Sequence, residues 1–508
     1  MTSAASPPLR GRFATVDEAM DAAADQFGDR EAYVDGDRRC TFGEWIAAAD
    51  TAAADLVAAG VRPGDVVAIT LPPSLDYAIA YAAVVRAGAV ATGLNTRLGV
   101  REVDAIMERS QPAVVISEPP VGDARSRLGG RRPRRSPDDP AVIIWTSGTT
   151  GLPKGAWFDH RGLEAAVATA GVMAAPFDRR LVATPFAHAG YMAKLWEQLA
   201  WGITVVITPQ PWSVDEMVRL LESERITVVG GVPTQWAKVV EHPALATADL
   251  SSLRLCLSAT APAPPELVKR MRERLGCSVV VRYAMTESPS ITGTEPGDAP
   301  EVLYHSVGRP QEGVEVELRD DEGRAVADGD VGRVHVRSAC AMRGYWRDET
   351  STAEAFTGDG WLRSTDLGRL DRDGNLVLVG RVSDMYIRGG YNVHPLEVEH
   401  VLAEHPAVAQ VSVVGVPAPV IGEKGVAFVV PAAGAAPPSA VELRSWCGER
   451  LADYKAPDDV VIVDALPVTS MMKVDKAALA ATALARDAGL GTGRSPGQVD
   501  AGWDIRPK

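Results

Sequence analysis

The sequence has few cysteines, no excess of positive charge and no long uninterrupted apolar run. Its five cysteines (Cys40, Cys256, Cys277, Cys340 and Cys447) are widely spaced and include no Cys-x-x-Cys pair. This pattern argues against a disulfide framework or a cysteine zinc site, and it indicates free thiols in a reducing compartment. The N-terminus lacks the apolar core of a signal peptide, and charges interrupt the alanine-rich runs. We therefore expect a cytoplasmic protein without a membrane span.

The balance of charge is negative, which excludes a second class of protein. A formal net charge of -14 argues against sequence-independent binding of nucleic acid, because such binding needs a broad basic surface. Anionic ligands must instead be held by local clusters of positive charge. The length of 508 residues, 46% of them hydrophobic, suits two or more domains with extended cores.

The stretch TSGTTGLPKG at 146–155 has the composition of a loop that binds phosphate, and it follows an apolar run, Ala141–Trp145, that predicts a buried strand. Glycines allow close approach of backbone N–H groups, hydroxyls donate hydrogen bonds, and lysine offsets charge. A Walker loop is excluded because Pro153 precedes the lysine and Gly155 follows it. A plain Ser/Gly/Thr linker is disfavoured, since a linker needs no buried strand before it. The candidate phosphate contacts are Thr146, Ser147, Gly148, Thr149, Thr150 and Lys154.

This loop resembles the signature of the adenylate-forming superfamily, which comprises acyl-CoA synthetases, luciferases and the adenylation domains of peptide synthetases. The resemblance implies an α/β fold with a large N-terminal domain of doubly wound sheets, a small β-barrel-like subdomain and a smaller, mobile α+β C-terminal domain. The expected boundaries are 1–380 for the first domain, 381–384 for a hinge, 385–486 for the second domain, and 487–508 for a disordered tail.

Local patterns predict several elements without reference to the family. Apolar residues at helical spacing predict helices at Val16–Phe27 and Phe42–Ala59, the second with Thr41 as N-cap and Glu44 completing a capping box. A strand within 61–73 and a helix at 75–88 follow, which indicates strand-helix alternation. Later in the chain, Pro395 stands at an expected first helical position. The Pro/Gly/Arg-rich segment 118–139 is expected to be an exposed loop.

The motif YAMTE at 283–287 is the second match to the superfamily, and it follows an expected strand, Cys277–Arg282. The resemblance places Tyr283 beside adenine, Thr286 on phosphate and Glu287 on Mg²⁺. The chemistry is consistent, because Mg²⁺ bound to ATP usually takes one or two carboxylates and retains water.

Segments at the ends of expected strands supply an acyl pocket in the resemblance. TPFAHAGYMAKLW at 184–196 contains no acidic residue, which disfavours an amino-acid substrate because a buried ammonium needs a charged partner. Relatives commonly have a glycine pair where Ala259 and Thr260 stand, so substrate selection is expected to differ there. Small residues, including Gly230, indicate a roomy apolar pocket and hence a bulky hydrophobic acid. The implied pocket residues are His188, Gly190, Gly231, Ala259 and Thr260, with Ala261 beside adenine.

Two further motifs complete the match in order along the chain. In WLRSTDLG at 361–368, the resemblance assigns Asp366 to the ribose hydroxyls, for which a carboxylate is a good double acceptor. It assigns Arg381 to ribose or phosphate and Lys473 to adenylation, although Met472 replaces the usual glycine before that lysine. The implied hinge is Ser383 with Asp384, and the implied passage for the pantetheine arm of CoA is lined by Gly389 and Gly390.

These motifs predict an acyl-CoA synthetase that uses ATP, Mg²⁺ and coenzyme A to activate a hydrophobic carboxylic acid. A ligase that loads a carrier protein remains the alternative enzyme, and a luciferase-type oxygenase is not distinguished by the motifs. A nucleotide-binding homologue with impaired catalysis is the alternative outside catalysis, suggested by Met472, Ser383 and the Ala259–Thr260 pair. Neither the acid nor the oligomeric state, monomer or homodimer, can be read from these motifs.

Overall fold

The computed structural model describes residues 6–120, 135–146, 152–261, 263–469 and 473–487. The chain forms two compact units. The first comprises Met1–Ala263, Leu267–Ser364 and Arg369–Val377, and the second comprises Pro264–Glu266, Thr365–Gly368 and Leu378–Lys508. Most of the predicted exposed loop at 118–139 and of the predicted tail at 487–508 lies outside the described residues.

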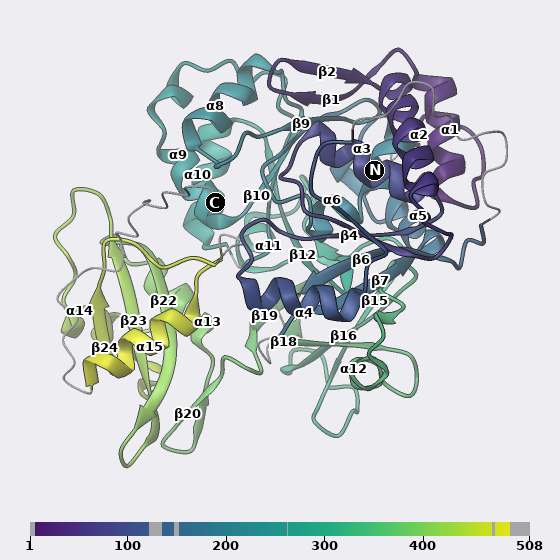
Figure 1. The fold of residues 1–508 in the computed structure, drawn as a ribbon. Coiled ribbons are helices and arrows are strands. Elements are labelled where there is room, and N and C mark those ends of the chain that lie inside the picture. The colour runs from purple at the N-terminus through teal and green to yellow at the C-terminus, as the bar shows by residue number, and fades with distance from the viewer. Residues whose placement is uncertain (1–5, 121–134, 147–151, 262, 470–472, 488–508) are drawn as a thin grey trace, which may run out of the picture. The chain divides into compact units, whose positions relative to one another are not determined.

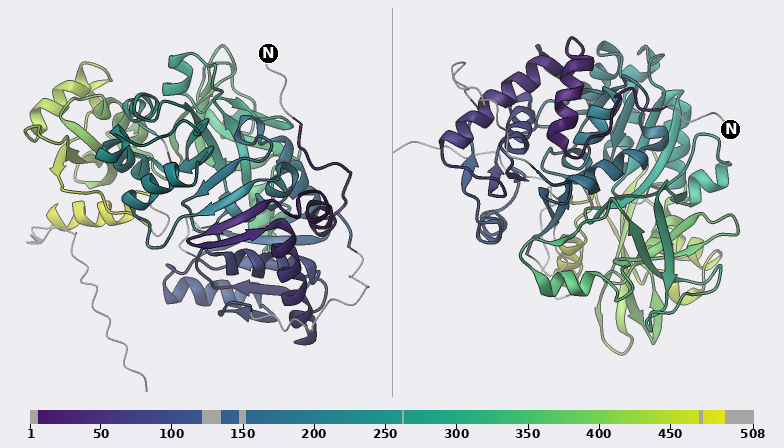
Figure 2. Two further views of the ribbon diagram at one scale, coloured as in Figure 1. Left: turned by 90° about the horizontal axis from the view of Figure 1, so that it is seen from above. Right: turned by 90° about the vertical axis from the view of Figure 1, so that its right-hand side faces the viewer.

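The larger sheet of the first unit has nine strands in the order β14-β13-β12-β11-β10-β8-β9-β1-β2. The run from β12 to β1 is parallel, and β13, β14 and β2 add antiparallel edges. Figure 2 shows strands of this sheet as adjacent teal arrows. In the order of the sheet, the strands are Arg309–Pro310, Ser288–Gly293, Ser278–Met285, Leu255–Ala259, Val228–Gly231, Arg179–Val182, Thr204–Ile207, Glu31–Asp35 and Arg38–Thr41.

Helices cover both faces of this sheet, as in a doubly wound fold. On one face, α8 (Val214–Ser223), α9 (Pro233–Glu241) and α10 (Pro265–Leu275) contribute to a core that includes Trp236 and Met271 (Figure 1). The opposite face packs with a second core built around Trp45, Tyr81 and Trp196. The remaining helices of the unit are α1 (Val16–Phe27), α2 (Phe42–Ala58), α3 (Leu75–Arg86), α4 (Val100–Ser110), α5 (His160–Ala168), α6 (Ala189–Met192), α7 (Leu195–Trp201), α11 (Pro300–His305) and α12 (Glu349–Ala355), with 3₁₀ turns η1 (Gly171–Met173) and η2 (Pro243–Ala246).

Two smaller sheets are formed by other strands that precede β20 along the chain. A six-stranded sheet runs β17-β7-β6-β4-β3-β5, and a four-stranded sheet runs β15-β16-β18-β19. The six strands are Gly344–Tyr345, Lys154–Asp159, Pro140–Thr146, Val90–Gly93, Val66–Ile69 and Val114–Ile116, and the four are Val314–Arg319, Gly332–Ser338, Leu362–Leu370 and Leu376–Arg381. The β15–β16 pair is antiparallel.

The second unit is a small α+β domain with a sheet of five strands, four in the order β21-β20-β23-β22 and β24 parallel to β23. Buried Val, Ala and Leu side chains join the sheet to its helices in two clusters. The strands are β20 (Tyr386–Arg388), β21 (Tyr391–Val393), β22 (Val408–Ala418), β23 (Gly422–Pro431) and β24 (Asp459–Ile462), and the helices are α13 (Pro395–Ala403), α14 (Ala440–Gly448), η3 (Asp453–Lys455) and α15 (Lys476–Asp487).

The elements predicted from local patterns are present, with small shifts at their ends. Helix α1 has the predicted bounds, and α2 ends one residue earlier than expected. Thr41 caps α2 with a full capping box, in which Glu44 N–H donates to Thr41 Oγ1 at 3.2 Å and Thr41 N–H donates to the Glu44 carboxylate at 2.9 Å. Pro395 opens α13 as predicted. Strand β12 extends through Met285, beyond the predicted end at Arg282, because it pairs with both β11 and β13.

Candidate active site

The hydroxyl-rich loop connects two paired strands. β6 and β7 form an antiparallel pair in which Thr146 lies opposite Lys154, so the ends of the loop are held together. Gly155 permits this pairing to pack closely, because a Cβ there would lie 2.7 Å from Ile143 Cγ2 and 3.0 Å from the ring of Trp145. The predicted phosphate contacts Ser147, Gly148, Thr149 and Thr150 lie outside the described residues.

A tyrosine that sequence reasoning missed connects the lysine of this loop to the predicted metal ligand. The Lys154 ammonium lies over the Tyr345 ring, 5.3 Å from its centroid, and Tyr345 OH donates to Glu287 Oε1 at 2.7 Å. Burial and the adjacent carboxylate raise the pKa of Tyr345, so the phenol keeps its proton and acts as a donor. No local pattern links Tyr345 to Glu287, because β17 reaches this position only by pairing with β7.

An arginine from α4 also supports the end of the loop. Arg109 Nη1 donates to the Pro153 carbonyl at 2.7 Å, directly before Lys154. The side chain is half-buried, and its contact with a backbone oxygen leaves the lysine charge available for a ligand. Sequence reasoning gave Arg109 no role.

Four parallel strands bring several predicted site segments to one edge of the larger sheet. β8, β10, β11 and β12 are neighbours and run in the same direction, so the residues after them leave at their common carboxyl edge. The segment with His188 follows β8, Thr260 follows β11, and Thr286 with Glu287 follows β12. Gly231 is the last residue of β10, and Ala261 is half-buried two residues beyond β11.

The histidine and glycines predicted to line the acyl pocket also have structural roles. His188 Nδ1 accepts a hydrogen bond from Gly190 N–H at 3.2 Å and so caps α6. A Cβ at Gly231 would lie 2.9 Å from Trp236 Nε1, and one at Gly230 would lie 2.8 Å from Leu257 Cδ2. The expectation that these two glycines leave open room is therefore wrong, because neighbouring side chains occupy the space.

The backbone of Thr260 has a conformation that glycine favours. Its φ is +79°, in the left-handed region that β-branched residues rarely adopt. Ala259 is half-buried at the end of β11. The chain therefore carries a strained residue at the edge where the predicted acyl and adenine contacts meet.

In the second unit, the two predicted ribose contacts lie together. Arg381 Nε donates to Asp366 Oδ1 at 3.0 Å, and Asp366 is buried. This ion pair holds the carboxylate in one orientation, which is consistent with its predicted role as acceptor of two hydroxyl hydrogen bonds. In the first unit, Tyr283 is 8% exposed, so its ring is fixed within the fold.

The second unit also contains the predicted hinge, passage and lysine. Ser383 Oγ donates to Asp384 Oδ1 at 3.0 Å. Gly389 and Gly390 form the two-residue turn between β20 and β21 with φ of +59° and +89°, a conformation that favours glycine irrespective of any ligand. Lys473 O accepts from Thr469 N–H at 2.7 Å at the end of a loop whose residues 470–472, including Met472, lie outside the described residues.

Glu287 fits a magnesium ion bound together with ATP. Its carboxylate supplies the hard oxygen ligands that Mg²⁺ prefers, and the Tyr345 hydroxyl orients one of them. Within the described ranges, no cluster of three or more His, Cys, Asp or Glu side chains could hold a metal by itself. Phosphate and water oxygens would have to complete the coordination.

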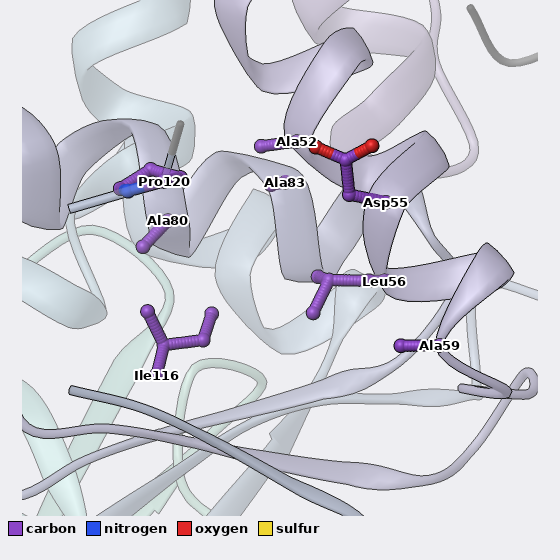
Figure 3. Close-up of a pocket in the computed structure, with 8 residues that line it drawn as sticks. All are labelled: Ala52, Asp55, Leu56, Ala59, Ala80, Ala83, Ile116 and Pro120. Carbon is purple, nitrogen blue, oxygen red and sulfur yellow. The ribbon is translucent and has the colours of Figure 1, made fainter. Parts of the chain in front are cut away.

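A cleft elsewhere in the first unit takes no part in this arrangement (Figure 3). Its lining comes from α2, α3, the end of β5 and the segment after β5, and includes Leu56, Ala83 and Ile116 with Asp55 as an acidic group. None of the predicted site residues lines it.

In the part of the chain that the structure describes, no helix combines the length and apolar character needed to cross a bilayer.

Two family profiles match the sequence. The profile described as AMP-binding enzyme matches residues 20–346, and the profile described as AMP-binding enzyme C-terminal domain matches residues 397–473. The chain belongs to the AMP-binding enzyme family. This finding confirms the predicted adenylate-forming, acyl-CoA synthetase-like assignment and the class of ATP-dependent acid-thiol ligase. Membership supports the use of ATP and CoA.

Relatives in this family resemble the chain over most of its length. A feruloyl-CoA synthase of Amycolatopsis sp is 36% identical over 442 residues, which cover 83% of this chain and 89% of that protein. A 3-[(3aS,4S,7aS)-7a-methyl-1,5-dioxo-octahydro-1H-inden-4-yl]propanoyl:CoA ligase of Mycobacterium tuberculosis is 35% identical over 508 residues, which cover 91% and 97%. ATP-bound MatB from Rhodopseudomonas palustris superposes with a TM-score of 0.85 at 29% identity, covering 92% of this chain and 99% of that one. The predicted fold class is thereby confirmed.

Proposed function

We propose that the enzyme activates a hydrophobic carboxylic acid as its acyl-adenylate and transfers the acyl group to coenzyme A. The observation that carries this proposal is the Lys154–Tyr345–Glu287 arrangement at the end of the hydroxyl-rich loop, which places a cation and an oriented carboxylate together. Two relatives support CoA as the thiol, since feruloyl-CoA synthase and the indenyl-propanoyl:CoA ligase are both named for CoA thioester formation. The absence of acidic residues between Leu181 and Lys194 supports an acid without an amino group.

The first half-reaction replaces a poor leaving group with a good one. The acid carboxylate attacks the α-phosphorus of ATP, the bond to the β-phosphate oxygen breaks, and pyrophosphate leaves with the electron pair. Lys154, Thr146 and the hydroxyls of the loop offset charge on the phosphates, and Thr286 donates to them. Glu287 would hold Mg²⁺, which when bound supplies further positive charge at the β and γ phosphates. Tyr283 and Ala261 border adenine, while Asp366 and Arg381 hold ribose.

The second half-reaction uses a different set of groups. The CoA thiolate attacks the acyl carbon of the mixed anhydride, and AMP departs. Lys473 is needed for the first half-reaction only, so the C-terminal domain at 385–486 turns about Ser383 and Asp384 between the two half-reactions and presents Gly389 and Gly390 to the pantetheine arm. His188, Gly190, Gly231, Ala259 and Thr260 line the acyl group. A cytoplasmic location agrees with the free state of all five cysteines.

The substitution Lys473→Ala tests this division of roles. Acid-dependent exchange of pyrophosphate into ATP should fall by at least a hundredfold, whereas thioester formation from supplied acyl-AMP and CoA should change less than threefold. Lys424→Ala is the matched control, because Lys424 is bound to Asp459 and Asp487 on the same unit and has no assigned role. Equal loss of both half-reactions would refute the assignment.

The thiol acceptor needs a separate experiment. Mass analysis of products formed with CoA and with a phosphopantetheinylated carrier protein should show acyl-CoA as the preferred product. Preferential loading of the carrier protein would favour the alternative ligase. Binding of ATP without formation of AMP across a broad panel of acids would instead indicate a homologue with impaired catalysis.

A further inference from the structure

A buried arginine lies beside the acyl edge of the larger sheet. Arg282 is in β12, directly before Tyr283, and its side chain is only 9% exposed. It pairs in register with Ala259 of β11, so the two side chains project from the same face of the sheet. Val280, two residues earlier on that face, packs with Leu255 in an internal cluster. The guanidinium is therefore held within the fold, next to a predicted acyl contact.

The guanidinium lacks the hydrogen bonds that a buried cation requires. Among the described residues, no acceptor bonds to its Nε, Nη1 or Nη2. The nearest carboxylate oxygen in an ion pair is Glu295 Oε1 at 3.6 Å from Nη2, beyond hydrogen-bond distance. Burial lowers the pKa of Arg282, and attraction by Glu295 and then Glu197 offsets that effect only in part. A buried arginine stays charged, so this environment favours an additional anion.

The surrounding backbone leaves room for this side chain. Gly293 of β13 lies opposite Arg282, and a Cβ there would lie 2.1 Å from Nη1. Any side chain at Gly293 would displace the guanidinium. On another side, a Cβ at Gly171 would lie 3.9 Å from Nη2. The absence of a side chain at Gly293 thus makes room for the guanidinium, whereas Gly171 only borders it.

The other buried carboxylate of this region is already engaged by two cations. Glu197 is 1% exposed, and its oxygens lie 2.6 Å from Arg180 Nη2 and 2.9 Å from Lys194 Nζ. Burial acts to raise the pKa of Glu197, but Lys194 and Arg180 more than offset it and lower the pKa to about 2. Glu197 is therefore ionised and paired with two other cations, so it neutralises Arg282 only in part.

We propose that Arg282 binds a second carboxylate of the acid substrate, so that the enzyme activates dicarboxylic acids with an apolar body. This inference rests on the proposed function and specifies its substrate class. A planar guanidinium with free N–H groups matches a carboxylate in a two-bond arrangement. The acid then lies with one carboxylate toward the phosphate loop and the other at Arg282. A monocarboxylic acid of the same length leaves the guanidinium without an acceptor and binds less tightly.

Matched pairs of acids test the proposal on the full-length enzyme. Pyrophosphate release is measured with hexanoate against adipate, and with 3-phenylpropanoate against its para-carboxylated analogue. The wild type should show at least tenfold higher kcat/KM for one dicarboxylate over its monocarboxylate partner. Arg282→Leu should lower kcat/KM for that dicarboxylate at least thirtyfold and should change kcat/KM for the monocarboxylate less than threefold. Arg282→Lys should give a kcat/KM for the dicarboxylate between those of the wild type and Arg282→Leu. Arg161→Leu, at a surface ion pair with Asp138, is the control.

The outcomes separate this proposal from the one on which it depends. Preference for monocarboxylates by the wild type, or loss of both substrates alike in a folded Arg282→Leu variant, overturns the second-carboxylate site but not acid activation. If the wild type prefers a keto acid and loses this preference in Arg282→Leu, the guanidinium binds a neutral carbonyl. That result would also overturn the second-carboxylate site. If no acid releases pyrophosphate, acid activation fails. In that case, a rise in melting temperature with the dicarboxylate, absent in Arg282→Leu, would still support the site, and no rise would overturn it.

Discussion

At the scale of single residues, Thr260 has a backbone conformation that suits glycine better than a β-branched residue. A threonine at a φ of +79° carries steric strain of about 1–2 kcal/mol relative to an ordinary conformation. Glycine removes that strain, but it adds roughly 0.5–1 kcal/mol of chain entropy to the unfolded state. We expect Thr260→Gly to raise the free energy of unfolding by up to about 1 kcal/mol, as measured by urea denaturation. Thr247→Gly, at a φ of -124°, should lower the free energy of unfolding. Equal decreases of this free energy in both variants would contradict the presence of strain at Thr260.

A substitution of Tyr345 should show how much the orientation of the Glu287 carboxylate contributes to Mg²⁺ binding, because it leaves the charge of Glu287 in place. Tyr345→Phe keeps the ring under Lys154 and deletes the hydroxyl that donates to Glu287. We expect the Mg²⁺ concentration needed for half-maximal pyrophosphate release to rise about tenfold, since partners that orient a metal ligand typically contribute that much. Tyr454→Phe, on a ring stacked with Tyr391, is the control. An unchanged Mg²⁺ requirement would remove Tyr345 from the site.

At the scale of elements, helix α4 positions the phosphate loop through a single side chain. Arg109→Ala deletes the hydrogen bond to the Pro153 carbonyl and releases the chain before Lys154. Because small displacements of a positioning group are costly, the KM for ATP should rise roughly tenfold with little change in melting temperature. Arg101→Ala, at an exposed position on the same helix, should leave KM unchanged. If both variants behave alike, α4 does not position the loop.

At the scale of the whole molecule, a buried histidine should make stability depend on pH. His160 is 2% exposed, and its Nδ1 accepts from Val16 N–H at 3.2 Å, which joins α5 to α1. Burial, and then repulsion by Arg135, lower its pKa from 6.5 to about 4. The folded state therefore keeps the ring neutral, while the unfolded chain takes up a proton below pH 6.5.

The free energy of unfolding should consequently fall as pH drops from 6.5 toward 4, by roughly 1–3 kcal/mol from this group. Urea denaturation at pH 7.5, 6.5 and 5 measures the effect. His160→Asn retains an acceptor for Val16 N–H but cannot titrate, so its stability should vary less over the same range. Identical pH profiles for the wild type and the variant would exclude His160 as the source.

Local order along the chain was predictable wherever a short pattern determines it. The capping box at Thr41 and the proline that opens α13 involve neighbours within one turn, so the sequence alone places them. The motifs likewise predicted that Asp366 and Arg381 share a ligand, and they form an ion pair across two adjacent strands. The prediction of open room beside Gly231 and Gly230 used residue size alone and was wrong, because Trp236 and Leu257 occupy that space.

By itself, the sequence determined the family, the class of reaction and several helices and strands, since periodicity, caps and ordered motifs act over short distances. Only the tertiary structure decided which distant side chains meet. Tyr345 reaches Glu287 across 58 positions, and the guanidinium of Arg282 lies against Gly293 on a neighbouring strand with no hydrogen-bond acceptor among the described residues. Such contacts depend on strand pairing and on the burial of charge, and neither has a local pattern that could reveal it.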